Sequence, residues 1–256
     1  MICLFLAFIG SEQSSEMNVL GKPLTPKARD FLIKQTELLG DIDFRNIAEH
    51  RSPFARKLDG CHELTNNRHI VWLKPENKDF ETCLMHEVMH GVLDYRGYPV
   101  TKRPDKLPDD EQAYQIGSIL MSVIQDIIID DQLTKDGLAV FDRQQAVNSK
   151  YTEAYNDYQS IQGRIVPYDF YYCKWALLTF KLISDSTITK DQKDYLSSYI
   201  KKKFPEAYDA GRRLGEGIII NAHTNPSEAL SAMVMLRDSF KLQKKVYVVD
   251  HKGNVY

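Results

Sequence analysis

The order of apolar and polar residues predicts a chain that is mostly helical. Helical patterns occur in residues 25–42, 80–96, 109–135, 143–182, 190–203, 205–215 and 226–240. Residues 68–75 alternate and end at a proline, so they predict a strand. Residues 245–256 predict a hairpin that turns near 251–254, whereas 44–67 and 98–108 are expected to be irregular. The expected fold class is therefore α+β, predominantly α-helical, with a small sheet.

No repeat or low-complexity tract divides the chain, so we expect a single domain over residues 17–256. Its centre is expected at 68–137, followed by a mostly helical remainder at 143–256 with the C-terminal hairpin. Residues 1–16 begin with an apolar stretch that lacks a basic flank, and they predict either a signal remnant or a mis-assigned start before Met17.

Charge and cysteine content narrow the choice of partners and compartment. The 256 residues include 33 basic and 35 acidic side chains, which predicts no nucleic-acid partner because such proteins carry a clustered basic face. The apolar N-terminal stretch is shorter than the ~20 residues of a membrane-spanning helix, so no stable membrane span is expected. The cysteines match no zinc knuckle, and the cytoplasm is the expected compartment, with export as the alternative if residues 1–16 belong to a signal peptide.

The segment from Cys83 to Gly97, CLMHEVMHGVLDYRG, carries the main chemical signal. His86 and His90 are four residues apart, so in a helix they project together and can chelate one metal ion. Glu87 lies at the edge of the same stripe. The neighbouring positions are apolar, and two buried imidazoles need partners because unpaired buried polar groups are costly. A metal ion would supply that partner, although two histidines of the core or surface remain the simpler alternative.

These residues form an HExxH motif, and the segment resembles the zincin metallopeptidases. The resemblance implies a zincin-like fold and one Zn²⁺ per chain, bound by His86 and His90. It also implies that Glu87 is the general base for a metal-activated water. In such enzymes an edge strand pairs with the substrate backbone, and by analogy this strand would be His69–Leu73. The metzincin subclass is excluded because Arg96 stands where its third histidine would be.

A third protein ligand is needed for a catalytic zinc site, and the long helix 109–135 offers one. Asp126 lies within an apolar run, where an isolated carboxylate would be costly to ionise. Asp130 follows four residues later on the same face. This pair resembles the gluzincin arrangement, which implies that Asp126 is the ligand and Asp130 orients a zinc-binding histidine. Gluzincins use glutamate as the ligand, so the aspartate is a departure that requires a closer approach of the two helices.

Several alternatives remain open at this stage. Asp126 and Asp130 could form the polar edge of an amphipathic helix, and either Asp130 or Glu111 could be the third ligand. Glu111 also has a full explanation as an acidic residue at a helix start. Asp94 could accept the free ring N–H of His90 or could be a surface carboxylate. Three further residues are candidates to stabilise an oxyanion unless they are simply exposed: Tyr95, Tyr98 and His223.

The expected function is that of a zinc-dependent metallopeptidase acting on a protein or peptide substrate whose identity the sequence does not reveal. The alternative is a catalytically silent, zincin-like metal-binding module with a regulatory or interaction role. The intact Glu87 favours the enzyme, since a metal site alone would not need it.

Overall fold

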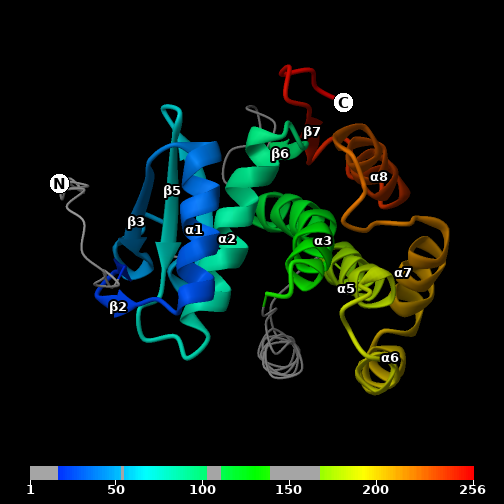
Figure 1. Ribbon diagram of the computed structural model, residues 1–256. Coiled ribbons are helices and arrows are strands. Elements are labelled where there is room, and N and C mark those ends of the chain that lie inside the picture. Colours follow the sequence, from blue (N-terminus) through cyan, green and yellow to red (C-terminus); the bar gives the residue numbers. More distant parts are fainter. Residues whose placement is uncertain (1–16, 53–54, 103–110, 139–167) are drawn as a thin grey trace, which may run out of the picture.

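The computed structural model describes residues 17–52, 55–102, 111–138 and 168–256 (Figure 1). The expectations for residues 1–16, for 103–110 and for most of 143–182 therefore lie outside the described residues. Within the described part the chain combines a small sheet region with a larger helical region, which confirms the expected α+β class. None of the helices in these ranges is both long enough and apolar enough to cross a membrane.

The main sheet has the strand order β3-β5-β4, with β3 spanning Ile42–Asn46, β4 Gly60–Thr65 and β5 Arg68–Leu73. β3 runs parallel to β5, and β4 runs antiparallel to it. Asn66 and Asn67 join β4 to β5 with φ angles of 52° and 58°. Two consecutive residues with positive φ make the tight turn whose twist matches a hairpin, and asparagine tolerates this conformation. The expectation of an irregular 44–67 is therefore wrong for both β4 and the first residues of that stretch.

The central position of β5 corrects a second expectation. His69–Leu73 was assigned by analogy to an edge strand, but β5 has a neighbour on each side. The antiparallel edge strand of this sheet is β4.

Two helices cover one face of the sheet. α1 spans Pro26–Leu39 and α2 spans Phe80–Tyr95 (Figure 1). Thr25 caps α1, accepting a hydrogen bond from the backbone N–H of Ala28, and Gly40 ends the helix with a φ of 75°. α2 also packs against α3, which spans Glu111–Lys135, so that α2 lies between the sheet and the rest of the molecule (Figure 1).

The remaining helices follow on the far side of α3 (Figure 1). In the described residues after α3 these are α5 (Tyr168–Ser184), α6 (Lys190–Lys203), α7 (Pro205–Gly217) and α8 (Pro226–Ser239). The predicted start of α8 is confirmed, because Asn225 and Glu228 form a reciprocal capping box.

Short strands and turns complete the structure. β6 (Val100–Lys102) pairs antiparallel with β7 (Tyr247–Val249), so the expectation of an irregular 98–108 is wrong for these three residues. The chain then turns back at 250–254 as predicted, and Val255 forms a bridge with Val249. The other short elements are β1 (Asn18–Val19), β2 (Lys22–Pro23) and the 3-10 turns Ile47–Glu49 and Ala55–Lys57.

One apolar cluster connects the two regions. It contains side chains from α1, β5, α2, α3, α5, α8 and β7. A second cluster joins α5, α6 and α7 around Trp175. Because α2 and α3 both contribute to the first cluster, the polar residues on their facing sides are held in a tightly packed setting.

Candidate metal centre

α2 directs His86 and His90 toward α3, as the four-residue spacing predicted. The two imidazole rings lie 5.0 Å apart, and the side chains are 9% and 15% exposed. Most of the other residues of α2 are buried, including Leu84, Val88 and Val92. The two imidazoles are therefore the main polar groups that α2 brings to its contact with α3, at the edge of solvent.

Asp126 on α3 completes a cluster of three metal-ligating groups. Its Oδ1 atom lies 3.5 Å from Nε2 of His86 and 3.5 Å from Nε2 of His90. One ligand atom from each residue lies within 4.8 Å of the others. These separations exceed the usual hydrogen-bond range of about 2.7–3.2 Å. They are close to the ~3.4 Å between neighbouring ligand atoms when each is about 2.1 Å from a tetrahedral metal ion.

The other ring nitrogens have acceptors that fix the imidazoles. Nδ1 of His86 lies 3.3 Å from Oδ1 of Asp130, and Nδ1 of His90 lies 2.9 Å from Oε1 of Gln125. The amide nitrogen of Gln125 donates to the carbonyl of Pro99 at 3.1 Å, which orients the amide oxygen toward His90. With Nδ1 of each imidazole donating to these oxygens, both Nε2 atoms would present lone pairs toward Asp126.

The role expected for Asp130 agrees with this geometry, whereas the role considered for Asp94 does not. Asp130 contacts His86 as an orienting carboxylate would, and it is fully buried. Gln125, not Asp94, holds Nδ1 of His90. Asp94 lies instead 3.7 Å from Nδ1 of His62, and burial raises the pKa of its carboxyl to about 6. Asp94 therefore belongs to a neighbouring group of side chains.

The electrostatic setting keeps His90 and Asp126 ready to bind a cation. Burial, and then the proximity of His86, lowers the pKa of His90 to about 4, so this imidazole is neutral near pH 7. Burial opposes ionisation of Asp126, but Lys181 on α5, followed by the two histidines, holds its pKa well below the usual range. The Lys181 ammonium lies 2.5 Å from Oδ2 of Asp126, a contact that the sequence did not predict.

The formal charge of this region suits a divalent cation. Asp126, Asp130 and Glu87 contribute three carboxylates, and Lys181 contributes one ammonium. When all four are ionised, their formal charges sum to −2, before any charge on His86 is counted. Uncompensated charge in a poorly solvated region is costly, so a bound dication would stabilise it.

Glu87 lies on a different side of α2 from the two ligands, toward β4. It is buried, and its Cγ would be 2.9 Å from a Cβ atom built on Gly60. The same added Cβ would lie 2.6 Å from the sulfur of Cys83, so only glycine allows β4 to approach α2 this closely. Burial, with Glu87 and then Glu63, also raises the pKa of Cys61 to about 12. Glu87 therefore packs against the edge strand β4.

A second histidine pair, which sequence reasoning missed, lies on the sheet side of α2. Nε2 of His62 on β4 is 3.0 Å from Nδ1 of His69 on β5, and the rings stack with centroids 5.2 Å apart. A Cβ atom on Gly91 would come within 3.2 Å of both side chains, so the glycine makes room for them. Burial, with His90 and His69 as smaller contributions, lowers the pKa of His62 to about 3.

The residues considered for oxyanion stabilisation have other surroundings. Tyr98 donates its hydroxyl proton to the carbonyl of Thr224, and Tyr95 is 61% exposed. His223 is exposed and lies 3.2 Å from the ammonium of Lys135 near the end of α3. The structure therefore does not bring these three residues to the ligand cluster. The side chain of Glu111, the rival third ligand, lies outside the described part of the chain.

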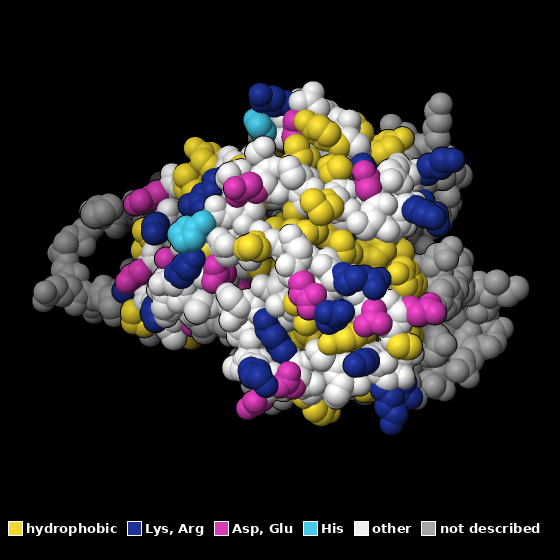
Figure 2. All heavy atoms as spheres, turned by 90° about the vertical axis from the view of Figure 1, so that its right-hand side faces the viewer, with side chains coloured by type: hydrophobic (Ala, Val, Ile, Leu, Met, Phe, Trp, Pro, Cys, Tyr) yellow, Lys and Arg dark blue, Asp and Glu magenta, His cyan; other side chains and the backbone are white. Residues whose placement is uncertain are grey.

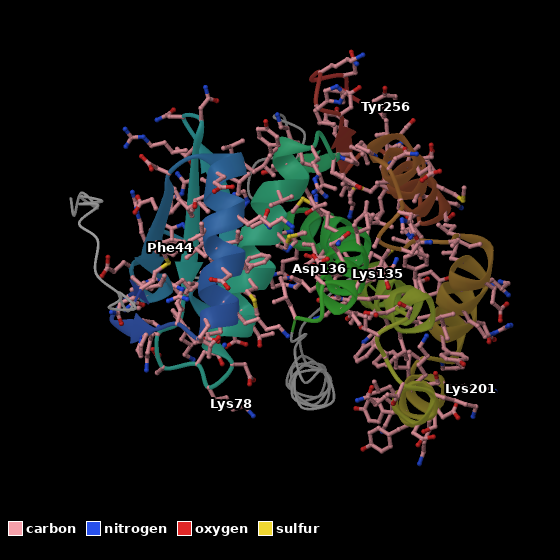
Figure 3. All side chains as sticks on the ribbon, viewed as in Figure 1. Phe44, Lys78, Lys135, Asp136, Lys201 and Tyr256 are labelled. Carbon is pink, nitrogen blue, oxygen red and sulfur yellow. The ribbon has the colours of Figure 1, made fainter. Side chains whose placement is uncertain are left out.

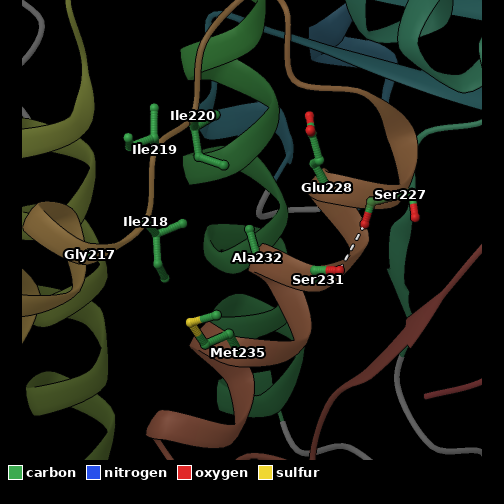
Figure 4. A pocket seen from close by; sticks show the side chains of 9 residues that line it. All are labelled: Gly217, Ile218, Ile219, Ile220, Ser227, Glu228, Ser231, Ala232 and Met235. Carbon is green, nitrogen blue, oxygen red and sulfur yellow. Dashed lines mark hydrogen bonds between the residues drawn. The ribbon is translucent and has the colours of Figure 1, made fainter.

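A surface groove lies away from this cluster. It has a volume of about 310 Å³ and runs between residues 217–220 and α8, with Ile218, Ile220 and Met235 among its lining side chains (Figure 4). On the face shown in Figure 2, basic and acidic side chains are interspersed. Neither this groove nor the mixed charge on this face adds a residue to the cluster of His86, His90 and Asp126.

No known protein family matches this chain, and no curated protein or solved structure is similar to it. The functional argument therefore depends on the geometry of the site and on the motif.

Proposed function

We propose that this protein is a zinc-dependent metallopeptidase whose metal centre is formed by His86, His90 and Asp126. The observation that carries the proposal is the convergence of two imidazole Nε2 atoms on one carboxylate oxygen, at separations of 3.5 Å. His90 is neutral near pH 7 and the carboxylate of Asp126 is held in its charged form, so both are electron-pair donors that a cation could bridge. The HExxH motif adds the general base that a hydrolase would require.

The donor set fits zinc better than calcium or magnesium. Imidazole nitrogen suits zinc and other transition metals, whereas calcium and magnesium prefer ligands that are all oxygen. Three protein ligands would leave a fourth position for water or substrate, as in catalytic zinc sites. When bound, the zinc ion would lower the pKa of a water molecule and polarise the scissile carbonyl.

The surrounding residues would divide the work of catalysis. Asp130 and Gln125 would hold the imidazoles in the tautomer that presents Nε2 to the metal. Glu87 would accept a proton from the attacking water and later deliver it to the leaving amine. The edge strand β4, next to Glu87, would pair with the backbone of an extended peptide substrate, because strand addition at a free edge needs no particular side chains.

The burial of Glu87 gives weight to a second function. A carboxylate packed between α2 and β4 is 8% exposed, so a substrate would reach it only if the surrounding side chains moved. A metal-binding module without turnover, with a regulatory or interaction role, requires no such movement.

One substitution separates the two functions. Glu87→Gln preserves shape and removes the base, so we expect unchanged zinc content and loss of peptide hydrolysis. The measurement is cleavage of an unbiased peptide library by zinc-loaded wild type and variant, with zinc content determined in parallel. Near-full activity in the variant would refute the role of Glu87. A zinc-loaded wild type that cleaves nothing in the library would instead support the binding module.

A further inference from the structure

Lys181 approaches the metal centre from a third helix. It lies on α5, which packs against α3, and its side chain is 23% exposed. The residues on either side of it, Phe180 and Leu182, are buried, so its backbone is firmly anchored in the core. The position of the ammonium is therefore set by the packing of α5 on α3.

The two oxygens of Asp126 have different partners. Oδ1 faces both Nε2 atoms at 3.5 Å, whereas Oδ2 accepts a hydrogen bond from Lys181 at 2.5 Å. A charge-assisted hydrogen bond of this kind is strong and directional, so it fixes the rotation of the carboxylate. Because Oδ2 already accepts from the Lys181 ammonium, Oδ1 is the oxygen better placed to bind a metal ion. Asp126 would then occupy one coordination position instead of two.

The charge of Lys181 has a second consequence. An ammonium beside a ligand carboxylate repels a dication and competes with it for the carboxylate charge. Orienting partners that accept hydrogen bonds, such as Asp130 and Gln125, increase metal affinity, and their loss typically weakens it ~10–100-fold. A cationic partner acts in the opposite direction, so Lys181 would reduce metal affinity while preserving an open coordination position.

We propose that Lys181 is a positioning residue that restricts Asp126 to one-oxygen coordination and limits the affinity of the centre for its metal ion. This inference rests on the proposed metal centre. It predicts that removing the ammonium strengthens metal binding, a result that a purely structural lysine would not give.

The test compares Lys181→Met, Lys181→Arg and a control on the same helix pair. Lys181→Met keeps much of the side-chain volume without the charge, and Lys181→Arg keeps the charge. The control is Lys135→Met, because Lys135 forms an ion pair with Asp131 at 3.3 Å near the end of α3, outside the ligand cluster (Figure 3). Zinc affinity is measured by competition with a chromophoric chelator, and circular dichroism shows whether each variant folds.

We expect Lys181→Met to bind zinc roughly tenfold or more tightly than wild type, and the other two variants to stay within about threefold of it. Replacement of zinc by cobalt(II) gives a second readout, since five-coordinate cobalt(II) absorbs visible light more weakly than the four-coordinate ion. The absorption of the cobalt-loaded Lys181→Met protein should fall as Asp126 gains its second metal–oxygen bond. If Lys181→Met instead misfolds, Lys181→Gln takes its place.

Three outcomes would overturn the inference. Unchanged zinc affinity and an unchanged cobalt spectrum in Lys181→Met would show that Lys181 has no influence on the centre. Weaker zinc binding would show that it supports the ligands as the other partners do. Failure of wild type to bind zinc or cobalt would remove the proposed metal centre as well, whereas the first two outcomes leave that centre intact.

Discussion

Two histidine pairs lie on neighbouring sides of α2, and only one of them has the surroundings of a metal site. His86 and His90 face Oδ1 of Asp126 at equal distances of 3.5 Å. His62 and His69 lie closer together, at 3.0 Å, but they form a hydrogen bond with each other. Asp94 lies 3.7 Å from Nδ1 of His62, on the ring nitrogen that does not face His69, and among the described residues only His86, His90 and Asp126 have ligand atoms that all lie within 4.8 Å of one another. Proximity of two imidazoles is therefore a weaker sign of a metal site than a shared carboxylate.

The largest expected effect is on zinc content, when each histidine pair is replaced in turn. The double variant His86→Ala, His90→Ala should lose stoichiometric zinc, because a single carboxylate cannot hold the ion. The matched double variant His62→Ala, His69→Ala should keep about one zinc per chain. Zinc is measured by elemental analysis after gel filtration. The comparison would be reversed if the second double variant, and not the first, lost its metal.

The next prediction ranks the residues around His86 and His90 by how much their substitution weakens zinc binding. Asp126→Ala should weaken zinc binding more than Asp130→Ala or Gln125→Ala, because a direct ligand carries more affinity than an orienting partner. Loss of either orienting partner should cost ~10–100-fold. Asp126→Asn should also weaken binding, since the carboxylate charge is lost, and Glu111→Ala should leave affinity nearly unchanged. Chelator competition gives the ranking, and a dominant effect of Glu111→Ala would move the third ligand to the start of α3.

A smaller effect concerns the stability of the metal-free protein at low pH. The pKa of His62 is lowered to about 3 in the folded protein, whereas the ordinary value in an unfolded chain is near 6.5. Between about pH 3 and pH 6.5, His62 therefore carries a proton in the unfolded chain but not in the folded protein. Stability contributed by the neutral His62 is therefore full above about pH 6.5 and is lost as the pH falls. Between pH 7.5 and pH 5 the loss is about 2 kcal/mol.

His62→Gln should remove that part of the pH dependence. Asp94 acts in the opposite direction, because its raised pKa of about 6 makes the folded state take up a proton first as the pH falls. Comparing urea unfolding of the two proteins at pH 7.5 and pH 5, both with chelator, isolates the contribution of His62. Equal pH dependence in the two proteins would mean that His62 is protonated normally in the fold.

Helical periodicity predicted that His86 and His90 share one face of α2, and the resemblance to gluzincins pointed to Asp126 as the residue that joins them. The i,i+4 spacing of His86 and His90 and the carboxylates of the apolar helix α3 are local features, and the structure brings His86, His90 and Asp126 together. Asp130 likewise takes the orienting position that its four-residue offset from Asp126 suggested. Periodicity determines which residues share a face, and two buried faces with complementary chemistry tend to meet.

Other parts of the site depend on tertiary packing that no local pattern reveals. Lys181 lies 55 residues after Asp126 on a helix whose direction is set by the apolar clusters. Gln125 was visible beside Asp126, but its role depends on the carbonyl of Pro99. The sequence did contain a signal for the hairpin of β4 and β5, since Asn66 and Asn67 are residues that favour its turn. The polar residues of β4, however, left no clear alternation of apolar and polar positions from which to predict the strand.

The most direct test of the metal centre is to locate the ion in crystals of the zinc-loaded protein by anomalous X-ray scattering at the zinc absorption edge. The account predicts one strong peak about 2.0–2.2 Å from Nε2 of His86, Nε2 of His90 and Oδ1 of Asp126. A peak between His62 and His69, or no peak at the α2–α3 contact in protein shown to contain zinc, would contradict it.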